Sequence, residues 1–377
     1  MASIPRPAGK LVWIHAASMG EANSVLPLLQ AMLAAYPQLN VLLTTVTVTS
    51  AAMMQGRLPE RAFHQFAPVD TPAAVDRFLA YWQPDIALWV DSEFWPNLIM
   101  EAKRRGAVMG VINARMSQKS FDAWLYGAPL IKGLLSCFSL CFAQSRQDAS
   151  RLRSLGVAVV TGVGNLKYDA PLLPYSEQEL ETLKTAAQGR AIWVAASTHP
   201  GEEKMIADVH RALKSQKVNA LTVIVPRHAK RGNDILPELG GLNIAQRSKG
   251  QPVTSATDIY LADTMGELGL FYRLASVAFI GGSLVEHGGQ NPLESARFGC
   301  AIVTGPHTYN FADVVKGMEV DKAILRVNNP PELAAALRQF LSDGEMRRKA
   351  GEAAQAHVNA KGGAMDGIMN ELRQYLT

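Results

Sequence analysis

Glu21 is the residue whose type and setting most directly suggest chemistry in this sequence. It follows an apolar run that begins at Val12 and a small-residue turn that ends at Gly20. In a parallel α/β sheet, ligands bind at the carboxyl end of the first strand, and a glutamate there can act as a base. Ser18 stands three residues earlier, a spacing that is also typical of a helix capping box. On this stretch alone, the cap is the favoured interpretation.

A glycine-rich stretch in the second half, residues 281–294, is the second chemical signal. Two Gly-Gly pairs precede Asn291, Pro292 and Glu294. Glycine lets the backbone approach a ligand, and a helix that begins at Pro292 offers N–H groups to an anion. Glu294 is placed to accept hydrogen bonds from a ribose diol, or else it only favours the helix dipole. The stretch is neither a Walker loop nor a GxGxxG loop.

Three smaller polar clusters follow other expected strands of the second half: 197–203, 226–228 and 263–268. Arg227 is suited to a phosphate or a carboxylate, and a helix expected from Gly266 offers further N–H groups to a phosphate. His228 has a second interpretation as a hydrogen-bonded surface histidine. The sequence contains no nucleophile elbow and no cluster with metal-ligand spacing, so we predict no metal site.

Strands and helices must alternate to position these residues, and the sequence shows this alternation twice. A proline- and glycine-containing break at 162–174 separates the two series. We therefore predict an α/β fold with two doubly wound, Rossmann-like domains facing a cleft, at residues 1–168 and 169–377. The last helix of the chain is also a candidate for packing back on the first domain. Strands are expected from Val12 and at 41–48, 63–67, 85–90, 108–112, 140–143, 157–161, 192–196, 221–225, 259–262, 277–280 and 301–304. Helices are expected at 24–36, 71–82, 98–105, 146–155, 202–213, 266–274, 292–298 and from 331 on.

Composition supports a globular enzyme. The chain has 377 residues, of which 48% are hydrophobic and 19% are charged, and this excludes a disordered protein. The three cysteines predict reduced thiols rather than disulfides or zinc. Residues 1–170 hold 15 Lys and Arg against 11 Asp and Glu, whereas the remainder holds 22 of each. This bias indicates an anionic ligand or surface for the first half, or ordinary solvated helix faces. No run is long enough to span a membrane, and the start lacks the apolar core of a signal peptide.

Considered together, the motifs resemble those of the 3-deoxy-D-manno-octulosonic acid (Kdo) transferases of lipopolysaccharide synthesis. Each motif is weak alone, and the joint order and spacing over nearly the whole chain carry the resemblance. The segments are Trp-Ile-His-Ala-Ala-Ser-Met-Gly-Glu (13–21), Glu-Phe-Trp-Pro-Asn (93–97), Asn-Ala-Arg-Met-Ser (113–117), Gly-Asn-Leu-Lys (164–167), Pro-Arg-His (226–228), Met-Gly-Glu-Leu (265–268), Gly-Gly-Ser (281–283) and Gly-Gln-Asn-Pro-Leu-Glu (289–294).

The resemblance implies an inverting GT-B glycosyltransferase that needs no cofactor and no metal in the chemical step. Its first domain would bind the lipid A precursor lipid IVA, and its second would bind CMP-Kdo. Glu21 matches the general base of the family. The residues predicted to bind the donor are Ser197, Thr198, Pro226, Arg227, His228, Met265, Gly266, Glu267, Leu268, Gly282, Ser283, Gly289, Asn291 and Glu294. The residues predicted on the acceptor side are Ser18, Gly20, Thr45, Thr47, Glu93, Asn113, Arg115 and Lys167.

Three departures from the family pattern accompany this resemblance. Asp91-Ser92-Glu93 stands where the family has Glu-Thr-Glu, and Gln290 stands where it has histidine. The hydrophobic anchoring segment of most members is missing, so we expect peripheral attachment to the cytoplasmic side of the inner membrane and no nucleic-acid partner. The alternatives are a paralogous transferase with a different acceptor such as a capsule glycan, a GT-B-like nucleotide-sugar epimerase, or a binding protein without turnover.

Overall fold

The structure, a computed structural model, describes residues 4–376 and consists of two compact units. Unit 1 comprises the chain up to Pro171 together with the segment from Lys361 on, and unit 2 runs from Leu172 to Ala360. The boundary therefore lies at Pro171 rather than at residue 168, and the C-terminal segment groups with unit 1. Among residues 4–376, no helix has both the length and the apolar character needed to cross a membrane.

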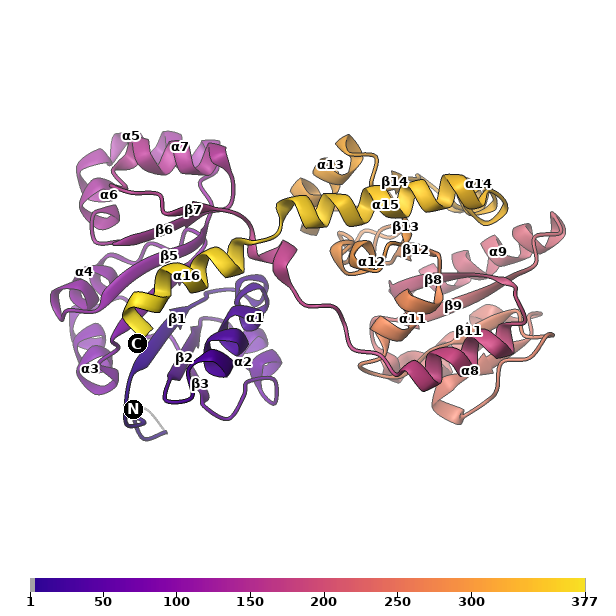
Figure 1. The fold of residues 1–377 in the computed structure, drawn as a ribbon, viewed down its shortest axis with the longest axis horizontal. Helices are drawn as coiled ribbons and strands as arrows, with labels where there is room; N and C mark the ends of the chain where they lie inside the picture. Colours follow the sequence, from indigo (N-terminus) through magenta and orange to yellow (C-terminus); the bar gives the residue numbers. More distant parts are fainter. Residues whose placement is uncertain (1–3, 377) are drawn as a thin grey trace. The chain divides into compact units, whose positions relative to one another are not determined.

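Unit 1 is built on a seven-stranded sheet with the order β3-β2-β1-β4-β5-β6-β7, in which every pairing is parallel (Figure 1). Its strands are β1 (Leu11–His15), β2 (Asn40–Thr45), β3 (Ala62–Phe66), β4 (Ile86–Val90), β5 (Val108–Ala114), β6 (Leu140–Ala143) and β7 (Gly162–Val163). Its helices are α1 (Met19–Ala35), α2 (Val48–Met54), α3 (Pro72–Trp82), α4 (Pro96–Arg104), α5 (Gln118–Tyr126), α6 (Ala128–Leu135), α7 (Arg146–Leu155), the 3₁₀ turn η1 (Leu166–Asp169) and α16 (Ala364–Leu376).

Helices cover both faces of this sheet because its central strands are apolar on both sides. On β1, Leu11 and Trp13 pack with α3, α4, α6 and α7, whereas Val12 and Ile14 pack with α1 and α16. In Figure 1 the yellow helix α16 lies along the sheet of unit 1. The last helix thus completes the core of unit 1 through Ile368 and its apolar neighbours.

Unit 2 repeats the same architecture with the strand order β10-β11-β9-β8-β12-β13-β14, again all parallel. Its strands are β8 (Ala191–Thr198), β9 (Ala220–Pro226), β10 (Ile244–Gln246), β11 (Ile259–Leu261), β12 (Val277–Ile280), β13 (Ala301–Thr304) and β14 (Leu325–Arg326). Its helices are α8 (Glu177–Ala187), α9 (Glu202–Ser215), α10 (Gly232–Ile235), α11 (Leu268–Leu274), α12 (Leu293–Arg297), α13 (Ala312–Val320), α14 (Pro330–Ser342) and α15 (Gly344–Lys361), with the 3₁₀ turns η2 (Ala229–Arg231), η3 (Leu236–Leu239), η4 (Arg247–Lys249) and η5 (Tyr309–Phe311).

Several predicted elements differ from the structure. The strand expected at 41–48 ends at Thr45, because Thr47 caps α2 by accepting the N–H of Ser50 (3.2 Å). The strand expected at 157–161 is irregular, and β7 forms one residue later, at Gly162 beside the Phe142 ring. Helix α1 begins at Met19 rather than at residue 24, α11 begins at Leu268 rather than at Gly266, and α8 was not predicted.

Candidate active site

The switch point of the unit 1 sheet lies between β1 and β4, where the strand order changes direction. Ligands of open parallel sheets bind at such a point, outside the carboxyl ends of the strands. Glu21 follows β1, whereas Asp91 and Glu93 follow β4. Electrostatic repulsion from Asp91 and Glu93 acts on Glu21, so the three carboxylates form one acidic group.

The cap predicted around Glu21 is present in a variant form, in which the glutamate accepts the N–H of Ala17 instead of that of the N-cap residue. Ser18 is the N-cap residue of α1, and its Oγ accepts the N–H of Glu21 (3.3 Å). In return, the Glu21 carboxylate accepts hydrogen bonds from Ser18 Oγ (2.7 Å) and from the N–H of Ala17 (2.8 Å). Glu21 is half-buried and Gly20 is exposed beside it. The cap therefore fixes the rotamer of a carboxylate that solvent and a ligand can still reach.

The pKa of Glu21 lies above the ordinary value for glutamate. Burial is the largest cause, and repulsion from Asp91 and Glu93 acts in the same direction. The hydrogen bonds from Ser18 and Ala17 oppose the shift. A raised pKa makes the ionised carboxylate a stronger base, which is the property needed to remove a proton from a hydroxyl group.

A polar network after β4 and β5 connects other residues of the predicted acceptor side. Asn113 donates to Asp91 Oδ1 (2.7 Å), and Gln144 contacts the same oxygen (3.2 Å). Both Asp91 and Asn113 have left-handed backbones, at φ 58° and 54°, which are sparsely populated for residues with a side chain. Burial raises the pKa of Asp91, while these hydrogen bonds and the charges of Lys167 and Arg115 lower it.

Three other predicted acceptor residues have structural contacts of their own. Thr45 is buried and its hydroxyl contacts His64 Nε2 (2.9 Å). Thr47 is exposed but caps α2. Glu93 accepts a hydrogen bond from Trp95 Nε1 (3.1 Å). The structure thus brings Ser18, Glu21 and Glu93 to the switch point. The hydroxyls of Thr45 and Thr47 instead form hydrogen bonds with His64 and with the start of α2.

All predicted donor residues lie along one edge of the unit 2 sheet. They end or follow four neighbouring strands, β11, β9, β8 and β12, whose carboxyl ends meet at that edge. Ser197 and Thr198 end β8, and Pro226 ends β9. Ser197 has a left-handed backbone (φ 58°), and the Thr198 hydroxyl donates to Glu203 (2.8 Å). Sequence order alone places these clusters far apart, and the parallel sheet assembles them.

Glu202 organises this edge, and sequence reasoning missed it. The side chain is fully buried (0% exposed) at the start of α9. Its Oε2 accepts the N–H groups of His199 (2.9 Å) and Gly282 (2.6 Å), and its Oε1 accepts those of Ser283 (3.0 Å) and Leu284 (3.1 Å). Burial raises the pKa of Glu202, and the four N–H donors oppose that shift. One carboxylate therefore connects the loop after β8 to the loop after β12.

The glycine-rich loop after β12 has the backbone that its sequence predicts. Gly282 and Gly289 have φ angles of 68° and 74°, which other residues rarely adopt. The Ser283 hydroxyl is committed within the loop, because it accepts the N–H of Gly305 (2.8 Å) and donates to the carbonyl of Ile280. These hydrogen bonds of Ser283 restrict the backbone of the loop.

The residues predicted to contact the nucleotide sugar lie beside one another at the end of this loop. Asn291 Oδ1 accepts the N–H of Leu293 (3.1 Å), and Asn291 Nδ2 approaches Glu294 (3.4 Å). Burial raises the pKa of Glu294, whereas Asn291, Arg297 and Arg227 lower it. Arg227 is exposed. Helix α12 has only five residues, so its main-chain N–H groups rather than a large dipole are what it offers an anion.

The cluster after β11 contains exposed residues and one residue, Glu267, that is hydrogen-bonded to its neighbours. Met265 is 76% exposed, and Gly266 has a φ of 82°. The Glu267 carboxylate is bound by Arg247 Nε (2.6 Å) and by the hydroxyl of Thr264, and Arg247 was not predicted. These bonds hold the pKa of Glu267 below its ordinary value. A groove of about 290 Å³ adjoins this cluster, lined by Pro174, Tyr175, Ser176, Gly266, Glu267 and Leu270.

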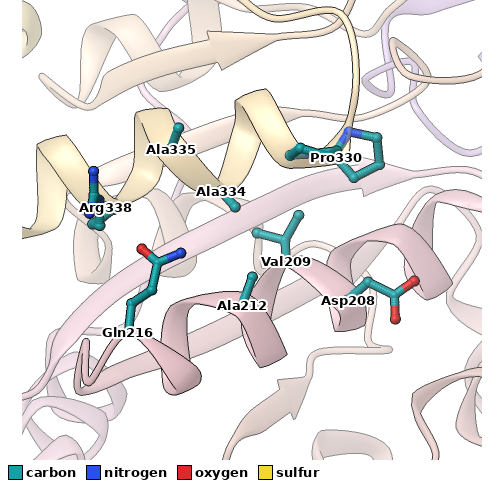
Figure 2. Close-up of a pocket in the computed structure, with 9 residues that line it drawn as sticks. Asp208, Val209, Ala212, Gln216, Pro330, Ala334, Ala335 and Arg338 are labelled. Atoms are coloured by element: carbon teal, nitrogen blue, oxygen red, sulfur yellow. The ribbon is translucent and has the colours of Figure 1, made fainter.

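A second groove of unit 2 lies away from the predicted site. It has a volume of about 350 Å³ and runs between α9 and α14, with Val209 and Ala212 facing Ala334 (Figure 2). None of the predicted donor residues lines it. Within residues 4–376, no group of three or more His, Cys, Asp or Glu side chains is arranged to hold a metal ion.

Two parallel sheets of this topology, each carrying polar side chains at its central switch point, define the GT-B class of glycosyltransferase folds. The same architecture occurs in MurG from Acinetobacter baumannii, with a TM-score of 0.59 and 10% identity over 97% of this chain and 100% of that one. It also occurs in UDP-GlcNAc 2-epimerase from Neisseria meningitidis, with a TM-score of 0.58 and 13% identity over 97% and 100%. These likenesses confirm the predicted fold class.

Sequence similarity identifies the family. The 3-deoxy-D-manno-octulosonic-acid transferase (kdotransferase) family matches residues 2–170, and the glycosyl transferases group 1 family matches residues 190–357. The 3-deoxy-D-manno-octulosonic acid transferase of Rickettsia felis is 36% identical over 89% of this chain and 72% of its own length. That of Haemophilus influenzae is 34% identical over 100% and 89%. The chain belongs to the family of 3-deoxy-D-manno-octulosonic acid transferases, as its motifs predicted.

Proposed function

We propose that this enzyme transfers Kdo from CMP-Kdo to a lipid A precursor, with inversion at the anomeric carbon and with Glu21 as general base. The observation that carries the proposal is the half-buried Glu21 carboxylate, which is capped by Ser18 at the switch point of unit 1 and whose pKa is raised. A carboxylate in this setting is oriented before substrate arrives and is basic enough to accept the proton of a sugar hydroxyl.

The proposed reaction consumes only the sugar donor and the acceptor. Glu21 takes the proton of the acceptor hydroxyl, whose oxygen forms the bond to the anomeric carbon of Kdo. The bond from that carbon to the phosphate oxygen breaks, and CMP leaves with the electron pair. The leaving group gains negative charge, which Arg227 and the N–H groups near Gly266 and Asn291 are suited to stabilise. We therefore expect transfer to need no metal and no cofactor, with a rate that EDTA leaves unchanged.

An acceptor of this kind is a membrane lipid, and one surface of unit 1 suits a bilayer. Helix α5 has no buried residue although it carries Leu125 (51% exposed) and Tyr126 (95% exposed), and Leu130 of α6 is 53% exposed. In the sequence, the exposed Lys119 precedes these apolar residues and the exposed Lys132 follows them. Apolar and basic groups together favour an anionic membrane surface. We propose that this surface attaches the enzyme to the cytoplasmic side of the inner membrane.

The test of the proposal is an assay of CMP-Kdo with tetra-acylated lipid A precursor, in which the products are weighed by mass spectrometry. We expect a mass increase of one or more Kdo units on the lipid and release of CMP that depends on the lipid. Kdo transfer to a capsule glycan but not to the lipid would instead favour the paralogous acceptor. Release of CMP without any acceptor would contradict the proposed transfer.

A further inference from the structure

Two histidines stack at the switch point of the unit 2 sheet, between β8 and β12. His199 follows β8 and His287 lies in the loop after β12, and their ring centroids are 3.6 Å apart with an interplanar angle of 31°. His199 is buried (6% exposed), whereas His287 is exposed. The ring centroid of a third histidine, His228, lies 6.3 Å from that of His199. Neither member of the stacked pair was among the predicted site residues.

The charged groups around His199 are basic. Burial is the main reason why the pKa of His199 is lowered to about 4, and His287, His228, Arg227 and Arg231 lower it further. Neighbouring cations disfavour a further positive charge and favour a negatively charged ligand. The environment of the pair is therefore suited to an anion.

The carboxylates near this pair are already engaged. Glu202 of α9 accepts four main-chain N–H groups, and Glu203 is bound by Arg231 (2.8 Å) and Thr198. Glu286, which precedes His287, is exposed. The hydrogen bonds of Glu202 go to main-chain N–H groups and those of Glu203 go to Arg231 and Thr198, so the imidazole rings are left for a partner of their own.

Two neighbours hold the rings in place. Gln290 Nε2 lies 3.0 Å from His199 Nε2, and an amide N–H donated there places the proton of the neutral His199 ring on Nδ1. Gly282 lies against both rings, because a Cβ at that position would lie 3.1 Å from His199 and 3.4 Å from His287. Its N–H is bound by Glu202 (2.6 Å). The pair thus has a fixed support and, at His287, an exposed face.

We propose that His199 and His287 bind an anionic group of the sugar donor, either the carboxylate of Kdo or the phosphodiester of the nucleotide. This inference rests on the proposed function, because both groups belong to CMP-Kdo. The switch point is where a ligand of such a sheet binds, and the basic pair is located there. Arg227 and Arg231, the charged side chains that act on His199, are cations, so a negatively charged ligand is favoured there.

The test compares His287→Phe with His287→Arg by isothermal titration calorimetry, using CMP and CMP-Kdo as separate ligands. His287 is exposed, so both variants keep the core of unit 2 intact. Phenylalanine keeps the stacked ring but removes the ring nitrogens that would bind the anion, and we expect CMP-Kdo affinity to fall about tenfold. Arginine supplies N–H donors and a permanent cation at the same position, and we expect CMP-Kdo affinity to be retained.

The two ligands distinguish the two sources of the anion. Loss of affinity for CMP-Kdo alone assigns the pair to the sugar carboxylate, and equal loss for CMP assigns it to the phosphodiester. If His287→Phe binds both ligands as the wild type does, the inference is wrong although the proposed donor stands. If the wild type binds neither CMP nor CMP-Kdo, the proposed donor itself is wrong.

Discussion

Each unit places a glutamate in the first turn of the helix that follows its central strand, and the two glutamates have opposite environments. Glu202 in unit 2 is fully buried, and its two oxygens accept four main-chain N–H groups. Glu21 in unit 1 is half-buried and accepts hydrogen bonds from Ser18 and Ala17. Four main-chain N–H groups converge on Glu202 and one on Glu21, and we propose that this difference separates a structural glutamate from a reactive one.

The loops after the neighbouring strand explain this difference. After β12 the chain supplies glycines, whose backbone can turn its N–H groups toward Glu202. After β4 it supplies Asp91 and Glu93, whose repulsion adds to the effect of burial in raising the pKa of Glu21. Burial raises the pKa of Glu202 as well, so the two switch points differ in that Glu202 is saturated with N–H donors and buried, whereas Glu21 is only half-buried.

The largest expected effect is on catalysis in unit 1. Glu21→Ala removes the proposed base, and we expect the rate of Kdo transfer to fall by about 10²–10⁴-fold while the affinity for CMP-Kdo is unchanged. Steady-state kinetics together with calorimetry of donor binding measure both quantities. Glu60→Ala, at an exposed glutamate of the same unit, is the matched control. A variant with the wild-type transfer rate would remove the contrast between the two glutamates.

The second effect is on the stability of unit 2. Glu202→Ala leaves four buried N–H groups without their acceptor, and we expect it to cost about 3 kcal/mol in the free energy of unfolding of this unit. Hydrogen–deuterium exchange of residues 281–284 should accelerate, whereas exchange in β1 should not change. Glu181→Ala, at an exposed ion pair of α8, is the control. Unchanged protection of residues 281–284 would show that Glu202 does not hold the loop.

The smallest effect is on the pH dependence of transfer. Transfer is lost as the pH falls through the raised pKa of Glu21, because the protonated carboxyl group cannot accept a proton. Asp91→Asn removes a repelling charge, so the pKa of Glu21 falls and the acidic limb moves to lower pH, by up to about one unit.

Ser18→Ala is the counterpart of Asp91→Asn, because it is expected to shift the pKa of Glu21 in the opposite direction. It removes a hydrogen bond that lowers the pKa of Glu21, so the acidic limb moves to higher pH. It also removes the cap of α1, at a cost of about 1 kcal/mol in the free energy of unfolding. If the pH–rate profiles of the Asp91 and Ser18 variants shift in the same direction, the proposed control of Glu21 by its neighbours is wrong.

Local pattern was sufficient to predict the parts of the molecule that depend on neighbours in sequence. The strand from Val12 and the N-cap at Ser18 depend on residues within one turn, and both are present, although α1 begins at Met19 and so shortens the turn predicted up to Gly20. The strand at 41–48 was predicted too long, because a threonine in a β-branched run also caps helices, as Thr47 does. The sequence pattern at Thr47 fits both a strand and a helix cap, and in the structure Thr47 caps α2.

Contacts between distant segments could not be predicted from the sequence alone. The short strand β7 forms where Gly162 lets the chain approach Phe142, a contact between residues of different strands. The bonds of Glu202 reach residues about eighty positions away, and no local pattern marks them. The pairing of His199 with His287 likewise depends on the adjacency of β8 and β12.

The most direct test of the account is the single-turnover rate of Kdo transfer between pH 5 and 8, measured for the wild type and for Glu21→Gln with saturating donor. The account predicts that the wild-type rate rises with pH through the raised pKa of Glu21. In Glu21→Gln, the rate should be at least about a hundredfold lower and should lose this rise. A Glu21→Gln enzyme that retains both the rate and the acidic limb of the wild type would contradict the assignment of Glu21 as the base.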